Sequence, residues 1–419
     1  MTQIIPNPRL VTPILDLLEP LPKKWVALTL QVAIGFGVGI LILILMIASI
    51  ELDWPAVFRP LDALGSMVSS TFDIWEQQFF MGGFLALCAA FSLAVVIHES
   101  AHFLTGRRLG FSLHSLQLGP VCFTFDRGKL KARFQMGSGI SGFTAMHVAS
   151  FVRLHRKLML FIAAGPASNL ICAIVAILLL RTRFSAGFDP YVTAAFRVFA
   201  LVSVFAFVIS VLPYSTTTGY YSDGGRLRML LFPNVATRRW YAIIGIGIQR
   251  RAGRRARDWN SRWIEAASAN WDKSRDAMSG TWMAYAAAYD RKDEPAAAAH
   301  LETCLRGINL AQSPFRDIVI AEAGVFQSWF RKDALKAAEW FARVKRPARL
   351  PPLLRSRAEV FRRFAQGDFD AAHNEWEKGL LVIAQAKEIT QRERLRHSWL
   401  EWKKEMEERR AADATILAQ

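Results

Sequence analysis

The sequence predicts a mainly α-helical, polytopic membrane protein with about four transmembrane helices, a small β-hairpin insert and a cytoplasmic helical-repeat domain. Three observations lead there. Apolar residues make up 52% of the 419 residues and the mean hydropathy is +0.20, which is high for a soluble protein. The apolar excess is concentrated in runs before residue 213. From about residue 250 the chain is charged and rich in helix-forming residues. We therefore divide it into an N-terminal cytoplasmic segment 1–24, a membrane-embedded domain 25–249 and a cytoplasmic domain 250–419.

Four apolar runs are long enough to cross a bilayer, because a transmembrane helix needs about 20 apolar residues. They are residues 25–50, 79–102, 157–180 and 191–212. The first run is too long for the core of a signal peptide, so we expect it to remain as an anchor. The shorter stretch 240–248 cannot span a membrane and suits an interfacial helix.

The charges of the loops predict the orientation of these helices. The loop 107–157 holds nine Lys or Arg and a single acid, whereas the loop 51–80 holds five acids and one base. Because basic loops stay on the cytoplasmic side, we expect both termini in the cytoplasm, with the bacterial inner membrane as the bilayer. The net charge of +17 lies beside the apolar runs, where it favours contact with anionic lipid. The chain has no zinc-knuckle or basic-zipper spacing, so no nucleic acid is expected.

A metal-binding motif stands at the inner end of the second apolar run, where residues 98–102 read H-E-x-x-H. His98 and His102 lie four residues apart, so one helical face carries both imidazoles. Glu99 follows the first histidine, where it can take a proton from a metal-bound water. Zinc lowers the pKa of that water and polarises a carbonyl, which is the chemistry of peptide hydrolysis. The alternative is a polar helix end at the membrane interface, although ionisable residues in a span are costly.

A catalytic zinc takes three protein ligands and leaves one position open, so a third ligand must come from elsewhere. Asp223 is the best placed, because it follows the fourth apolar run closely and precedes two glycines that let the backbone turn tightly. A plain turn aspartate is the alternative reading of this residue. The candidates on the same side of the membrane are His114, His147, His155, Asp126 and Asp223.

Three motifs together resemble the site-2 protease family of intramembrane zinc metalloproteases, over about residues 80–230. They are H-E-x-x-H at 98–102, Gly-Pro-Ala-Ser-Asn at 165–169 in the next apolar run, and Asp-Gly-Gly at 223–225. The resemblance implies that His98, His102 and Asp223 bind Zn²⁺ and that Glu99 is the catalytic base. It also implies that Asn169 is a polar residue near the substrate groove.

One departure from that family lies before Asp223. The family commonly has Asn-Pro a few residues before Asp-Gly, whereas this chain has Leu212 and Pro213 followed by the longer stretch 214–222. Zinc binding remains compatible with this sequence. Positioning of substrate by the loop is the property that the departure puts in doubt.

A β-hairpin is predicted between the first two motifs. Val121, Phe123 and Phe125 alternate with smaller or polar residues, a turn follows at 126–129, and the alternation resumes from Leu130 to Phe134. In the resembling family, a β-element here dips to the membrane and holds substrate. A free strand edge can pair with an unwound substrate segment and expose its backbone. The alternative is a hairpin that only covers the loop.

The C-terminal region contains three related segments. Each segment has an aromatic residue, an aspartate, an alanine and a large apolar residue at intervals of four. The first is Tyr289, Asp293, Ala297 and Leu301, and the other two start at residues 329 and 364, which lie 40 and 35 residues after the preceding start. This resembles tetratricopeptide-type helix pairs, whose concave surfaces bind peptides. The alternative is an ordinary helical bundle. We expect the last stretch, 392–412, to be a charged helix with a capping or solvated position.

Together these patterns predict a zinc endopeptidase that cleaves peptide bonds in or next to transmembrane segments, as in regulated intramembrane proteolysis. The expected partners are a transmembrane protein substrate, the lipid bilayer and a cytoplasmic protein bound by the helical tail. The alternative is a non-catalytic membrane scaffold whose tail binds partner proteins. The intact Glu99 argues against the scaffold, because a scaffold has no need of a base.

Overall fold

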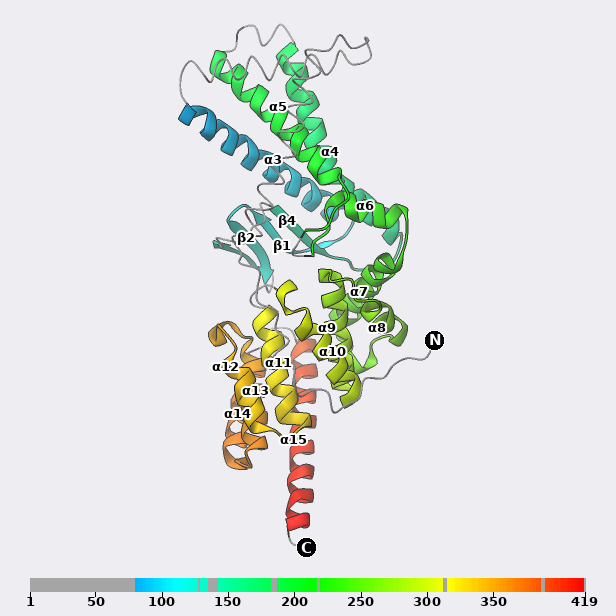
Figure 1. The fold of residues 1–419 in the computed structure, drawn as a ribbon, viewed down its shortest axis with the longest axis vertical. Coiled ribbons are helices and arrows are strands. Elements are labelled where there is room, and N and C mark those ends of the chain that lie inside the picture. The colour runs from blue at the N-terminus through cyan, green and yellow to red at the C-terminus, as the bar shows by residue number, and fades with distance from the viewer. Residues whose placement is uncertain are drawn as a thin grey trace. The chain divides into compact units, whose positions relative to one another are not determined.

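The structure is a computed structural model that describes residues 80–126, 129–134, 142–181, 187, 189–216, 219–311, 315–385 and 389–417 (Figure 1). The predicted cytoplasmic segment 1–24 and the predicted first transmembrane helix 25–50 lie outside these residues. The described chain divides into two compact units, one ending at Pro233 and the other beginning at Asn234.

Three apolar helices dominate the first unit, and they are α3 (Phe80–Arg108), α4 (Leu154–Arg181) and α5 (Pro190–Val211). In the part of the chain that the structure describes, these 3 helices are long and apolar enough to cross a membrane. They pack against one another, with Ala90 and Ala94 of α3 buried against Val198 and Val202 of α5. These helices confirm the predicted runs 79–102, 157–180 and 191–212. The total of four spans stays a prediction.

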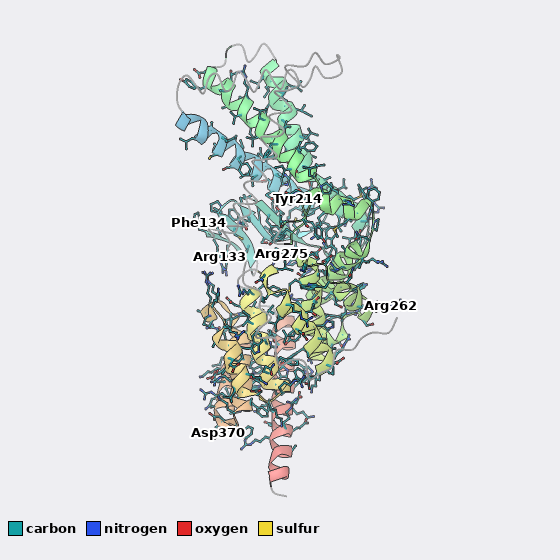
Figure 2. All side chains as sticks on the ribbon, in the orientation of Figure 1. Arg133, Phe134, Tyr214, Arg262, Arg275 and Asp370 are labelled. Carbon is teal, nitrogen blue, oxygen red and sulfur yellow. The ribbon has the colours of Figure 1, made fainter. Side chains whose placement is uncertain are left out.

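A four-stranded antiparallel sheet connects α3 to α4, in the order β3-β2-β1-β4 (Figure 1). Its strands are β1 (Ser112–Leu118), β2 (Val121–Asp126), β3 (Lys129–Phe134) and β4 (Gly142–His147). The predicted hairpin is β2–β3, whose register pairs Val121 with Phe134 and Asp126 with Lys129. The end of β3 is solvent-exposed at Phe134 (Figure 2).

The insert is therefore larger than the predicted hairpin, because β1 and then β4 extend the sheet beyond β2. An irregularity between Leu113 and Ser115 shifts the β1–β4 register. Such a bulge breaks the alternation of apolar and polar residues by which a strand is recognised. The sheet ends on this side at β4, which is therefore an edge strand.

The second unit consists of helices arranged largely as successive antiparallel neighbours. It begins with residues 234–249, which the sequence analysis placed at the end of the membrane-embedded domain, and that domain division stays a prediction. Its helices are α7 (Val235–Arg251), α8 (Ser261–Ser268), α9 (Arg275–Asp290), α10 (Glu294–Arg306), α11 (Phe315–Phe330), α12 (Ala334–Ala342), α13 (Pro352–Ala365), α14 (Phe369–Ala384) and α15 (Ile389–Leu417).

The three related segments have the same local structure. In each pair, an aspartate caps the second helix by accepting a hydrogen bond from a backbone N–H three residues on. The residue before each aspartate has positive φ, and an alanine four residues after it is buried. The aspartates are Asp293, Asp333 and Asp368. The sequence pattern thus marks three equivalent helix–turn–helix corners, and their assignment to the tetratricopeptide type stays a prediction.

The C-terminal helix α15 is not a solvated helix along its whole length. Trp399 is 1% exposed, and its indole Nε1 donates to Trp376 O while Trp376 Nε1 donates to Trp399 O. Further along, Arg409 donates to the carbonyl of Trp329 in α11. One face of α15 therefore packs on α11 and α14, which fits the capping position that was one of the two expectations and not the solvated one.

Candidate metal centre

Two histidines of α3 point their Nε2 atoms at the same place. The Nε2 atoms of His98 and His102 lie 3.2 Å apart, as expected for residues separated by one turn of helix. His102 Nδ1 lies 2.7 Å from the carbonyl oxygen of Phe161, which fixes the proton on Nδ1 and leaves Nε2 with a free lone pair. His98 Nδ1 lies 3.0 Å from the side-chain amide of Asn169. Both rings are thus oriented by groups of α4.

Asp223 completes the cluster from the start of α6 (Asp223–Leu231). Its Oδ2 lies 3.0 Å from His98 Nε2 and 3.5 Å from His102 Nε2. Burial acts to raise the pKa of Asp223, but the adjacent imidazoles of His102 and His98 outweigh it and lower the pKa to about 2. The carboxylate is therefore ionised at neutral pH, as metal coordination requires.

The two ends of the stretch 214–222 lie close together, so Asp223 lies near the end of α5. Ser215 and Tyr221 form an antiparallel bridge, and Gly219 has φ +76°, the left-handed conformation that glycine adopts without strain. Tyr214, where the stretch begins, is labelled in Figure 2. The hydroxyl of Ser222 donates to Leu212 O and accepts from Gly225 N, which caps α6. The additional residues thus form a closed turn and leave Asp223 beside the other ligands.

Close helix contact explains the glycine after Asp223. Gly224 lies against the backbone of Val211 and Leu212, where a side chain would overlap the carbonyl groups at the end of α5. The sequence suggested a tight turn at this point. Instead, Gly224 is the second residue of α6 and is required for close approach.

The three ligand atoms fit a zinc ion. Their separations of 3.0, 3.2 and 3.5 Å form a nearly equilateral triangle. Zinc bonds of about 2.0–2.1 Å in tetrahedral geometry place ligand atoms about 3.3 Å apart. Gly165 of α4 keeps the space open, because a Cβ there would overlap the Nε2 atoms of both histidines. Among the described residues, this is the group of His, Cys, Asp or Glu side chains that is arranged to hold a metal ion.

Glu99 lies beside the cluster and is 7% exposed. Its Oε2 accepts a hydrogen bond of 2.5 Å from the hydroxyl of Thr144 on β4. Gly142 of the same strand packs against the Glu99 carboxylate so closely that a side chain could not be accommodated. The glutamate is thus held by β4 and is not one of the three grouped ligand residues.

The other candidate ligands lie outside this cluster. His114 and His147 lie on the neighbouring strands β1 and β4, with their ring centroids 4.6 Å apart. His155 is exposed in the first turn of α4, and Asp126 ends β2. Sequence reasoning did not identify Thr144 or the carbonyl of Phe161, because their roles depend on the folding of β4 and α4 against α3.

Asn169 is 1% exposed beneath His98. The sequence predicted a residue near the substrate groove, and the structure places its amide against a candidate metal ligand. Its Oδ1 is buried and has no hydrogen-bond partner among the described residues. The amide oxygen and nitrogen can be exchanged without changing the shape of the side chain. Oδ1 then accepts a hydrogen bond from His98 Nδ1–H. That arrangement leaves His98 Nε2 free for metal.

A comparison with family models matches the chain to peptidase family M50 over residues 86–332. This range includes α3 from residue 86 onward, all of α4, α5 and α6, and therefore all the residues of the candidate centre. Searches of curated proteins and of solved structures give no match.

Proposed function

The chain belongs to peptidase family M50, the site-2 protease family of membrane metallopeptidases, and on that premise we propose that it is a zinc-dependent intramembrane endopeptidase. The observation that carries the proposal is the convergence of His98, His102 and Asp223, with Glu99 beside them on an apolar helix. Its reaction would be hydrolysis of a peptide bond in or next to a substrate's transmembrane segment.

His98, His102 and Asp223 would hold the zinc ion through Nε2, Nε2 and a carboxylate oxygen. When bound, zinc would supply a Lewis acid for the scissile carbonyl and lower the pKa of a water. Glu99 would accept the proton of the attacking water and pass it to the leaving amine. Phe161 O and Asn169 would keep the imidazoles in the tautomer that leaves Nε2 available.

Substrate would be presented as an extended segment. A transmembrane helix resists hydrolysis because its amides are bonded internally, so it must unwind near the cleavage site. In the described part of the chain, β4 pairs with β1 on one side and forms the edge of the sheet on the other. Because Thr144 and Gly142 of β4 contact Glu99, a segment that adds to this edge would lie next to the base.

The helical unit from Asn234 onward would choose among substrates and contribute no group to the chemistry. Its corners repeat in a way that supports a helical-repeat, peptide-binding role. Because α15 occupies part of the surface of α11 and α14, a partner would bind the surface that α15 leaves accessible. The charge asymmetry of the loops supports a bacterial inner-membrane location with both termini in the cytoplasm.

A specific observation also weakens the scaffold alternative. That alternative gained support from the long stretch before Asp223, which could have displaced the third ligand. The closed turn from Ser215 to Tyr221 keeps Asp223 within 3.5 Å of both histidines, so the stretch does not dismantle the centre. A degenerate core would have no reason to retain this geometry.

The test is a comparison of the wild-type chain with Glu99→Gln, each purified in detergent and each co-expressed with a single-span substrate. Removal of the base should lower the cleavage rate by a factor of about 10² to 10⁴. Zinc content measured by elemental analysis should be unchanged. If the Glu99→Gln protein loses its zinc, Glu99 serves as a ligand or a structural group, and the proposed division of roles is wrong.

A further inference from the structure

The contact between β4 and the candidate base is more specific than packing requires. Thr144 Oγ1 lies 2.5 Å from Glu99 Oε2 and 3.2 Å from the Glu99 backbone oxygen. A hydroxyl has one proton, and the shorter distance assigns it to the carboxylate. Gly142, two residues earlier, closes the other side of the Glu99 side chain. The Glu99 carboxylate is therefore enclosed by β4, whose Thr144 lies 45 residues after Glu99 in the sequence.

A glutamate that acts as a base needs one oxygen available and a fixed orientation. Its side chain has several rotamers, and most of them would carry the carboxylate away from the reacting water. The hydrogen bond from Thr144 uses one lone pair of Oε2, and the carboxylate keeps further lone pairs to accept a proton. Oε1 faces Gly142, whose missing side chain leaves room beside it. A displacement of about 1 Å in such a group can cost a factor of about 10² in rate.

We propose that Thr144 is a positioning residue that holds Glu99 in its reactive orientation, an inference that rests on the proposed role of Glu99 as the base. Through this contact, β4 couples the pairing of substrate to the orientation of the base. The hydroxyl of Thr144 does not touch substrate or metal in this scheme. It acts through Glu99. The coupling follows from position, because the strand whose edge would receive substrate is the strand that fixes the carboxylate.

The register of the sheet supports this coupling. On β4, Thr144 pairs with Leu116 of β1 and Ala145 pairs with Ser115. β1 therefore anchors β4 from one side at the position of the hydroxyl. Pairing of a substrate segment along the opposite edge would restrain β4 from both sides and tighten its hold on Glu99.

The experiment compares Thr144→Val, which removes the hydroxyl at nearly constant volume, with Thr144→Ser, which retains it. Thr124→Val on β2 is the matched control, because it makes the same change in the same sheet away from Glu99. Each full-length protein is purified with zinc, and kcat and KM are measured for a single-span substrate in bicelles. Zinc content and thermal unfolding are measured alongside.

We expect Thr144→Val to lower kcat by about 10- to 100-fold, with KM within about twofold and full zinc content. Thr144→Ser should recover most of the lost rate, and Thr124→Val should match the wild type. A Thr144→Val protein with wild-type kcat would overturn the proposal. So would an equal loss in the serine variant, or a loss of zinc or thermal stability that accounts for the lower rate.

The same experiment separates this inference from the proposed function. If the wild-type protein and Glu99→Gln are equally inactive, the proposed function fails. If the wild type is active, Glu99→Gln is inactive and Thr144→Val is unaffected, only the positioning role is wrong.

Discussion

Asn169 offers a sharp test of how the metal ligands are oriented. Its buried side-chain amide lies 3.0 Å from His98 Nδ1. A ligating imidazole must carry its proton on the nitrogen that faces away from the metal, and that proton needs an acceptor. Replacing Asn169 with leucine removes the acceptor at similar volume and leaves the His98 Nδ1–H without this partner.

The magnitude follows from the loss of one oriented hydrogen bond to a ligand. Such outer partners typically contribute 10- to 100-fold in metal affinity, or about 1.4 to 2.8 kcal/mol. Asn169→Leu should therefore bind zinc about 10- to 100-fold more weakly in a chelator competition assay. Asn169→Asp retains an acceptor for the His98 proton and should bind zinc at least as tightly as the wild type.

The assay also distinguishes the substrate-groove role predicted for Asn169 from the orienting role. A groove residue would change KM while leaving the zinc affinity intact. Zinc affinity of Asn169→Leu within twofold of the wild type would refute the orienting role. Ser168→Ala is the matched control, because its hydroxyl donates to Gly165 O within α4 and does not contact the centre.

Two further predictions concern the metal and the helical unit. Asp223→Ala should lose zinc during purification, whereas His147→Ala and His155→Ala should retain it. If Asp223→Ala keeps its zinc and either histidine variant loses it, the third ligand is a different residue. Truncation after Pro233 removes the second compact unit whole and should leave slow cleavage of a generic single-span substrate without preference among substrates. A folded, zinc-loaded truncated protein that cleaves nothing would show that the helical unit takes part in catalysis.

The apolar helices and the histidine motif could be predicted because their signals are local. The predicted runs 157–180 and 191–212 differ from α4 and α5 by at most three residues at either end. The stretch 240–248, expected to form an interfacial helix because it is apolar but too short to span a membrane, lies within α7. In the same way, the four-residue spacing of His98 and His102 needs only one helix to bring their Nε2 atoms together.

The remaining site residues depend on contacts between distant parts of the chain. Thr144 reaches Glu99 through an edge strand whose register is shifted by an irregularity in β1, so no period in the sequence marks it. Phe161 contributes a backbone carbonyl, which any residue type could supply. The stretch before Asp223 looked like a disruption, and only the bridge between Ser215 and Tyr221 shows that it closes on itself.

The most direct test of a zinc-dependent intramembrane protease is cleavage by the purified chain in lipid nanodiscs, with the cut mapped by mass spectrometry. We predict that the zinc-loaded protein cuts a single-span substrate within or beside its transmembrane segment. Removing zinc with a chelator should stop the reaction, and adding stoichiometric zinc should restore it. Cleavage that persists without metal, cuts confined to soluble loops, or a zinc-loaded protein that leaves every single-span substrate intact would contradict the account.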